Sequence, residues 1–199
     1  MAFFSAKNAG LAFMIVGALS ILGAVLFIIL RAIDVDMDDV AAHELLYFIL
    51  TGIGSIIAGL LYFGYGKKIR SGAIEAKIDI LATFVKIVGI CIIVTGIFNV
   101  IASVSEGEEL GTALVAAIIA IILGLIVMFI ASKINDGKQT IGDKLIWIIL
   151  LIVFVICILL AILEIITIIG IISGICDLII YSFMLLTLVD NDVKAEMGI

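Results

Sequence analysis

Long runs of apolar residues alternate with short polar segments along the whole chain of 199 residues. A helix needs about 20 apolar residues to cross the hydrocarbon core of a bilayer. The stretch from Leu145 to Val189 is longer than two such helices and contains Glu164. An acidic residue such as Asp at a helix centre costs about 2.5 to 3.5 kcal/mol on insertion scales. We therefore divide this stretch at Glu164, which places Glu164 in a tight turn at the membrane surface. The pattern predicts an all-α, polytopic transmembrane bundle with spans over residues 10–30, 45–66, 80–104, 110–132, 144–163 and 168–189.

One part of the chain recurs at a constant offset of 65 residues. The segment 44–72 matches 109–137: both begin with Glu-Leu, and both end in Lys-Ile-x-x-Gly. The repeat predicts that consecutive spans pair as helical hairpins, and the third copy is the weakest in sequence. We expect one transmembrane domain over 1–199, built from hairpins at about 9–72, 73–137 and 138–191, with a short acidic tail over 190–199.

Basic residues mark one side of the predicted membrane domain. Nine of the eleven Lys and Arg residues lie in the N-terminal segment, in two basic turns and in the tail, whereas the opposite loops hold only Arg31. Loops rich in Lys and Arg stay on the cytoplasmic side of a membrane. The charges predict a multi-pass protein of the cell membrane with both termini cytoplasmic and the acidic loops outside.

Composition excludes an ordinary soluble domain. Hydrophobic residues make up 65% of the chain and charged residues 14%, against roughly half and a quarter in soluble proteins. The first apolar run exceeds the 7 to 15 residues of a signal peptide, so we expect it to remain as a helix. The bilayer is the expected partner and nucleic acid is not, since the net charge is -6. With one His and no catalytic motif, we predict no enzyme activity and no cofactor.

Two charged residues fall inside predicted spans. Lys86 lies about 10 Å into the membrane, where its long stem can snorkel to the headgroups. Asp177 lies near mid-membrane and cannot snorkel, and desolvation favours its protonated form. Asp177 either donates a hydrogen bond to a neighbouring helix, or pairs with Lys86, or forms a proton or ion site.

The first acidic loop resembles the opening of a calcium-binding loop. Carboxylate oxygens suit Ca²⁺, but Asp39 stands where that loop needs Gly, and Leu45 stands where it needs a bidentate Glu. Two interpretations stay open, a solvated acidic loop and a weak divalent-cation site. The candidate metal ligands are Asp34, Asp36, Asp38, His43 and Glu44.

Small residues line several spans at helical spacing, which allows helix backbones to approach closely in lipid. Gly170 and Gly174 form a GxxxG motif. These faces predict either packing within the bundle or association with a second copy or a larger membrane complex. The candidate packing residues are Gly54, Gly59, Gly124, Gly170 and Gly174.

The three short hairpins, with Gly-spaced segments at 17–23 and 51–59, resemble the small six-helix acid-resistance membrane proteins of prokaryotes. The resemblance implies a non-enzymatic, stress-related membrane protein of a prokaryote. Two functional hypotheses follow: a structural or accessory role through the Gly and Ala faces, or a small transporter or channel for protons or small ions that uses Asp177 and Lys86.

Overall fold

The computed structural model describes residues 5–34, 39–105, 109–166 and 171–199, with the backbone alone for residues 34 and 39–44. The described residues form helices and contain no strand, and six of the helices are long and apolar enough to cross a membrane. The predicted all-α fold with six spans is therefore confirmed. The helices are α1 Ala6–Asp34, α2 Asp39–Arg70, α3 Lys77–Ser105, α4 Leu110–Ile134, α5 Ile141–Ile166, α6 Ile171–Leu188 and α7 Asn191–Glu196.

Most helices extend beyond the apolar run that predicted them, because a helix continues until a local signal stops it. At the end of α2, Gly72 has a φ of 78°, and the amide of Ala73 donates to the carbonyl of Lys68 at 3.0 Å. This is the glycine-terminated Schellman arrangement. At the start of α5, the backbone amide and the hydroxyl of Thr140 both donate to Asp143 Oδ2, so this carboxylate satisfies a backbone donor at the helix N-terminus. Polar residues at these ends therefore fix the helix limits.

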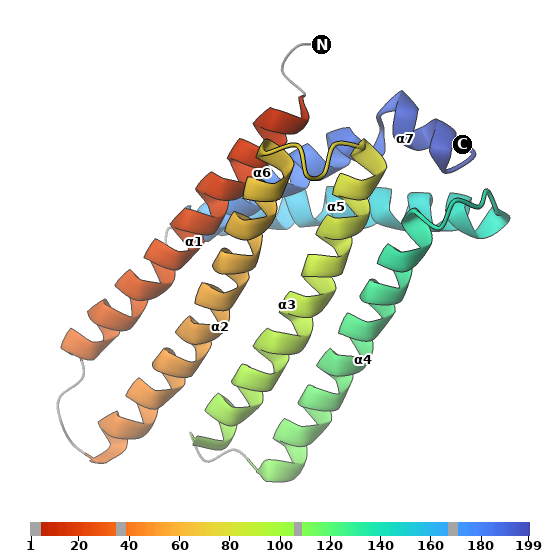
Figure 1. The fold of residues 1–199 in the computed structure, drawn as a ribbon. Coiled ribbons are helices and arrows are strands. Elements are labelled where there is room, and N and C mark those ends of the chain that lie inside the picture. The colour runs from red at the N-terminus through yellow and green to blue at the C-terminus, as the bar shows by residue number, and fades with distance from the viewer. Residues whose placement is uncertain (1–4, 35–38, 106–108, 167–170) are drawn as a thin grey trace.

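Consecutive helices pair as predicted from the repeat. The most extensive contacts join α1 to α2, α3 to α4 and α5 to α6, and α2 also packs against α3. Figure 1 shows α1, α2, α3 and α4 side by side in one layer, in chain order. The hairpin of α5 and α6 crosses behind this layer.

The start of α6 lies beside the middle of α1 rather than beside its end. An added Cβ on Gly23 of α1 would lie 3.8 Å from Ile172 Cγ2, close to the start of α6. Gly23 is eleven residues before the end of α1, or about 16 Å along the helix. The predicted place of Glu164, in a tight turn at the membrane surface, stays a prediction.

An aromatic cluster docks the third hairpin on the first two. The Phe84 ring of α3 is 6.0 Å from the Phe154 ring of α5 and 6.1 Å from the Tyr181 ring of α6. On its other side, Phe84 lies 5.7 Å from Phe13 of α1, which in turn lies 4.9 Å from Tyr65 of α2. Phe84 has no exposed surface. Tyr62 of α2 also lies 6.4 Å from Phe84, so five helices meet at one buried side chain.

The segment that was expected to be a tail forms α7 and packs into the core. The Asp190 side chain caps this helix by accepting from the amide of Asp192 at 3.0 Å. Val193 is fully buried, and Met197 is 1% exposed. An N-terminal cap followed by apolar residues four positions apart is a signal for a short amphipathic helix.

Candidate functional site

Three of the five predicted packing glycines lie where the two helices of a hairpin cross. An added Cβ on Gly59 would lie 2.8 Å from the carbonyl oxygen of Gly17, so α1 and α2 are in backbone contact there. The matching position Gly124 would place a Cβ 2.7 Å from the carbonyl oxygen of Gly89. These distances leave no room for a side chain at either glycine.

The third hairpin makes the same crossing. An added Cβ on Gly174 would lie 2.8 Å from the carbonyl oxygen of Ala161. In all three hairpins the first helix supplies a small residue and an Ile four residues later, and the second helix supplies a glycine. The first-helix pairs recur every 72 residues: Gly17 with Ile21, Gly89 with Ile93 and Ala161 with Ile165.

The other two predicted packing residues differ from this pattern. An added Cβ on Gly54 would lie 3.6 Å from Thr95 Cγ2, an ordinary contact between α2 and α3. Gly170 lies outside the described residues. The GxxxG motif therefore contributes Gly174 to the third crossing within the chain.

Asp177 lies between hairpins. It is half-buried on α6, and its carboxyl group is within electrostatic range of Tyr62 on α2, Tyr181 one turn further along α6, and Cys157 on α5. Cys176, the preceding residue, is within the same range of the Asp177 carboxyl group. The sequence marked Asp177, but nothing in its pattern indicated these neighbours.

A second carboxyl group accompanies Asp177. Glu164, in the last turn of α5, accepts a hydrogen bond from the Ser173 hydroxyl of α6 at 2.9 Å. Glu164 also lies within electrostatic range of Asp177. Glu164 and Asp177 are the charged residues within the otherwise apolar stretch 145–189.

Lys86 does not pair with Asp177. Lys86 is exposed on α3, two residues beyond Phe84, which is about 200° around the helix. Since Phe84 faces Phe154 and Tyr181 of the third hairpin, Lys86 points away from that hairpin. In the part of the chain that the structure describes, the ion pairs are Lys77 with Asp190 and Asp192, and Lys133 with Asp136.

The candidate cation ligands of the first acidic loop cannot be placed. Asp36 and Asp38 lie outside the described residues, and for Asp34, His43 and Glu44 the structure gives no side-chain position. Elsewhere, no group of three or more His, Cys, Asp or Glu among the described residues could hold a metal ion. A cation site in this loop stays a prediction.

A scan against protein-family models and searches of curated proteins and of solved structures find no match to the chain.

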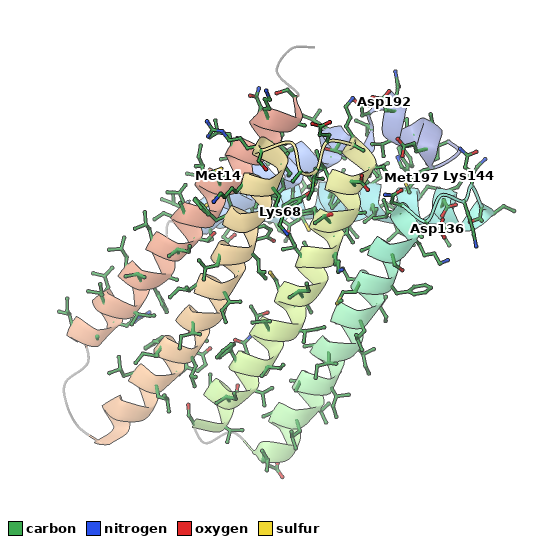
Figure 2. The ribbon with its side chains drawn as sticks, in the orientation of Figure 1. Met14, Lys68, Asp136, Lys144, Asp192 and Met197 are labelled. Carbon is green, nitrogen blue, oxygen red and sulfur yellow. The ribbon has the colours of Figure 1, made fainter. Side chains whose placement is uncertain are left out.

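One polar network escaped prediction. Lys77, at the start of α3, donates to Asp190 at 2.7 Å and to Asp192 at 2.9 Å, and so binds the chain end that precedes and includes α7. Figure 2 shows Asp192 and Met197 at the side of the molecule where Asp136 and Lys144 lie. Partial burial opposes ionisation of Asp190, but the hydrogen bonds from Lys77 and the Asp192 amide outweigh it and lower the pKa of Asp190.

Trp147 of α5 is the only tryptophan in the chain and lies against the same segment. Its Nε1 donates to the Leu188 carbonyl at 2.9 Å, and the Lys194 ammonium sits 5.8 Å from the ring centroid. The Gln139 amide also donates to the Ala195 carbonyl at 2.9 Å. These contacts anchor α7 on the start of α5.

Proposed function

We propose that the protein is a non-enzymatic integral membrane protein with a structural or accessory role, of the stress-related kind that its resemblance implies. The observation that carries this proposal is the glycine crossing repeated in all three hairpins. Close backbone contact commits Gly59, Gly124 and Gly174 to packing, so they hold helices together rather than line a path. A scaffold of this kind presents its outer faces to lipid or to a partner.

The outer faces are strongly apolar. Along α4 and α5, large side chains such as Leu125, Phe129 and Leu159 are more than half exposed. A soluble protein would not tolerate apolar surface of this extent, whereas lipid tails or another membrane helix cover it without cost. This supports a role that is exercised within the bilayer, through association with a second copy or a larger membrane complex.

Association can be tested by purification from native membranes with a mild detergent and measurement of the mass of the complex. We expect a fixed stoichiometry with itself or with one membrane protein. Leu125→Ser with Phe129→Ser on α4 should weaken that association, and Leu159→Ser with Leu163→Ser on α5 is the matched control for the other face. A monomer at native abundance, unchanged by either pair, would contradict the accessory role.

We also propose that the basic ends of the helices and both termini are cytoplasmic. Lys7 begins α1, α2 ends with three basic residues, and Lys77 begins α3, which supports a common side for them. A membrane-impermeant maleimide tests this with Ser5→Cys and Glu109→Cys in a variant whose three native cysteines are Ser. Labelling of intact cells at position 5 but not 109 would reverse the orientation.

A second candidate is a small transporter or channel for protons or small ions. Asp177 favours it, because a half-buried carboxyl group between hairpins can exchange a proton with its surroundings. Proteoliposomes with an internal pH-sensitive dye would report proton flux. Asp177→Asn should abolish the flux and Lys86→Gln should leave it intact, since Lys86 points away from the third hairpin. Flux that is absent from the wild type, or is unchanged in Asp177→Asn, removes this candidate.

A further inference from the structure

A shallow groove opens between α1 and the end of α2, with a volume of about 380 Å³. Met14 of α1 and Phe63 of α2 supply its apolar wall. Lys67 and Arg70 of α2, with Ser71 just after that helix, supply its polar rim. Figure 2 shows Met14 on α1 and Lys68 on α2 towards the same end of this helix pair.

The groove has a fixed shape because its two helices are locked together beside it. An added Cβ on Gly66 would lie 2.5 Å from the carbonyl oxygen of Gly10 and 2.7 Å from the amide nitrogen of Met14. Backbone contact of this kind leaves little freedom for the helices to slide or separate. The groove is thus formed before any ligand arrives, which reduces the entropy that binding costs.

The two cations at the rim are available to a ligand. Lys67 and Arg70 are both exposed, and no ion pair within the described ranges joins either one to a carboxylate. At helical spacing they share one face of α2 with Phe63, and Arg70 lies about 10 Å beyond Phe63 along the axis. Lys7 lies on the same face of α1 as Met14, two turns nearer the end, and adds a third positive charge to this region.

We propose that this groove binds the headgroup of an anionic phospholipid. A phosphate diester accepts hydrogen bonds from the Lys67 ammonium and from the planar Arg70 guanidinium, which suits two phosphate oxygens at once. The acyl chains then run towards the membrane interior, over Phe63 and Met14. Basic pockets between transmembrane helices at a membrane surface favour anionic headgroups. The net charge of the chain is -6, so this positive site is a local feature rather than a consequence of overall charge.

The proposal goes beyond the structural role and can be tested separately from it. The full-length protein in detergent is titrated with phosphatidylglycerol or with phosphatidylcholine of the same acyl chains, and native mass spectrometry counts the bound lipids. We expect phosphatidylglycerol to bind first and with higher affinity. Lys67→Gln with Arg70→Gln should weaken its binding about 25-fold, since each cation near a membrane surface contributes about five-fold.

The matched control is Lys68→Gln with Lys144→Gln, which removes the same charge outside the groove; Lys68 lies on α2, and Lys144 lies at the other side of the molecule (Figure 2). Equal loss of affinity in both double variants would show general electrostatic attraction and overturn the proposal. Equal affinity for both lipids would overturn it as well. Circular dichroism checks that the variants fold, and all four residues are exposed.

A third titration distinguishes a lipid from a free anion. Inorganic phosphate at millimolar concentration is at least as negatively charged as the lipid headgroup but has no acyl chain to lie on Phe63 and Met14. We expect it not to displace phosphatidylglycerol, and displacement would show a soluble-anion site instead. Phe63→Ser should weaken the binding of phosphatidylglycerol, because it removes part of the apolar wall. It should not weaken the binding of phosphate, because both cations stay in place.

Discussion

Lys77 Nζ lies 2.7 Å from Asp190 Oδ2, although the two residues are 113 positions apart. This bond joins the first residue of α3 to the residue that caps α7. It is the polar counterpart of the aromatic cluster around Phe84, which joins the same two parts of the chain inside the bundle. The third hairpin and α7 are thus attached to the layer of α1 to α4 at two levels.

Lys77→Gln should loosen α7 and lower the stability of the fold slightly. Both partners are partly exposed, at 31% for Lys77 and 22% for Asp190, so solvent screens the pair and we expect a loss of about 1 kcal/mol or less. Thermal unfolding in detergent measures the change, and limited proteolysis should cut after Lys194 sooner. Lys138→Gln is the control, since Lys138 lies outside this network, and an equal effect there would contradict the assigned role of Lys77.

The same contact predicts an acid-induced release of α7. Because the pKa of Asp190 is lowered in the folded protein, its ionised form contributes stability that is complete above the ordinary value of 3.8 and is lost as the pH falls below it. Trp147 reports the release, because it contacts Leu188 and Lys194 directly. We expect its fluorescence to shift to longer wavelength below about pH 4. Asp190→Asn should lack this transition, and an identical acid transition in this variant would refute the assignment.

The apolar runs were sufficient to predict six helices, because run length and bilayer thickness decide that question alone. The repeat predicted which helices pair, and the glycines at 59 and 124 marked the first two crossings. The path of the third hairpin could not be predicted. Its direction depends on how Phe84, Phe154 and Tyr181 fit together, and helices that are apolar on every side have no pattern that indicates which face turns inward.

The candidate site shows the same limit at the level of single residues. The cost of a charge inside a membrane marks Lys86 and Asp177 wherever they point, so the sequence singled out both. Whether they meet depends on the rotation of α3 and α6, which turns Lys86 away from the third hairpin. The bond between Lys77 and Asp190 was missed for a related reason, since both residues read as ordinary loop charges beside a span.

Substitution at a glycine crossing should separate the helices of that hairpin. Gly59→Val introduces a side chain where even a Cβ would lie 2.8 Å from the Gly17 carbonyl oxygen, and overpacking of this kind costs about 1 to 3 kcal/mol. Gly124→Val should behave alike. Gly64→Ala is the matched control on α2, because an added Cβ there meets nothing within 4 Å. We expect that variant to be as stable as the wild type or more so, since Ala favours a helix over Gly by about 1 kcal/mol.

Stability can be followed as resistance to unfolding by sodium dodecyl sulfate, with circular dichroism to detect helix loss. The two substitutions should change stability differently: Gly59→Val should destabilise the protein, and Gly64→Ala should leave its stability unchanged or raise it. If both substitutions destabilised the protein equally, the cost would come from membrane insertion or from lipid contacts common to the whole helix, and the crossing at Gly59 would have no special role.

Phe84→Ala should detach the third hairpin while leaving the first two intact. The side chain is fully buried and contacts aromatic rings from α1, α5 and α6, and truncation of a buried Phe costs about 3 to 5 kcal/mol. Phe129→Ala, at a position 63% exposed on α4, removes the same atoms from a face that lipid can cover, and should change little.

Disulfide trapping separates local from global effects: Gly23→Cys with Ile172→Cys tests the contact of α1 with α6, and Gly54→Cys with Thr95→Cys tests that of α2 with α3. In Phe84→Ala the first pair should cross-link less and the second as before, because the crossings within each hairpin do not involve Phe84. Equal loss of both cross-links would mean that the bundle unfolds as one unit and that Phe84 does not serve specifically to dock the third hairpin.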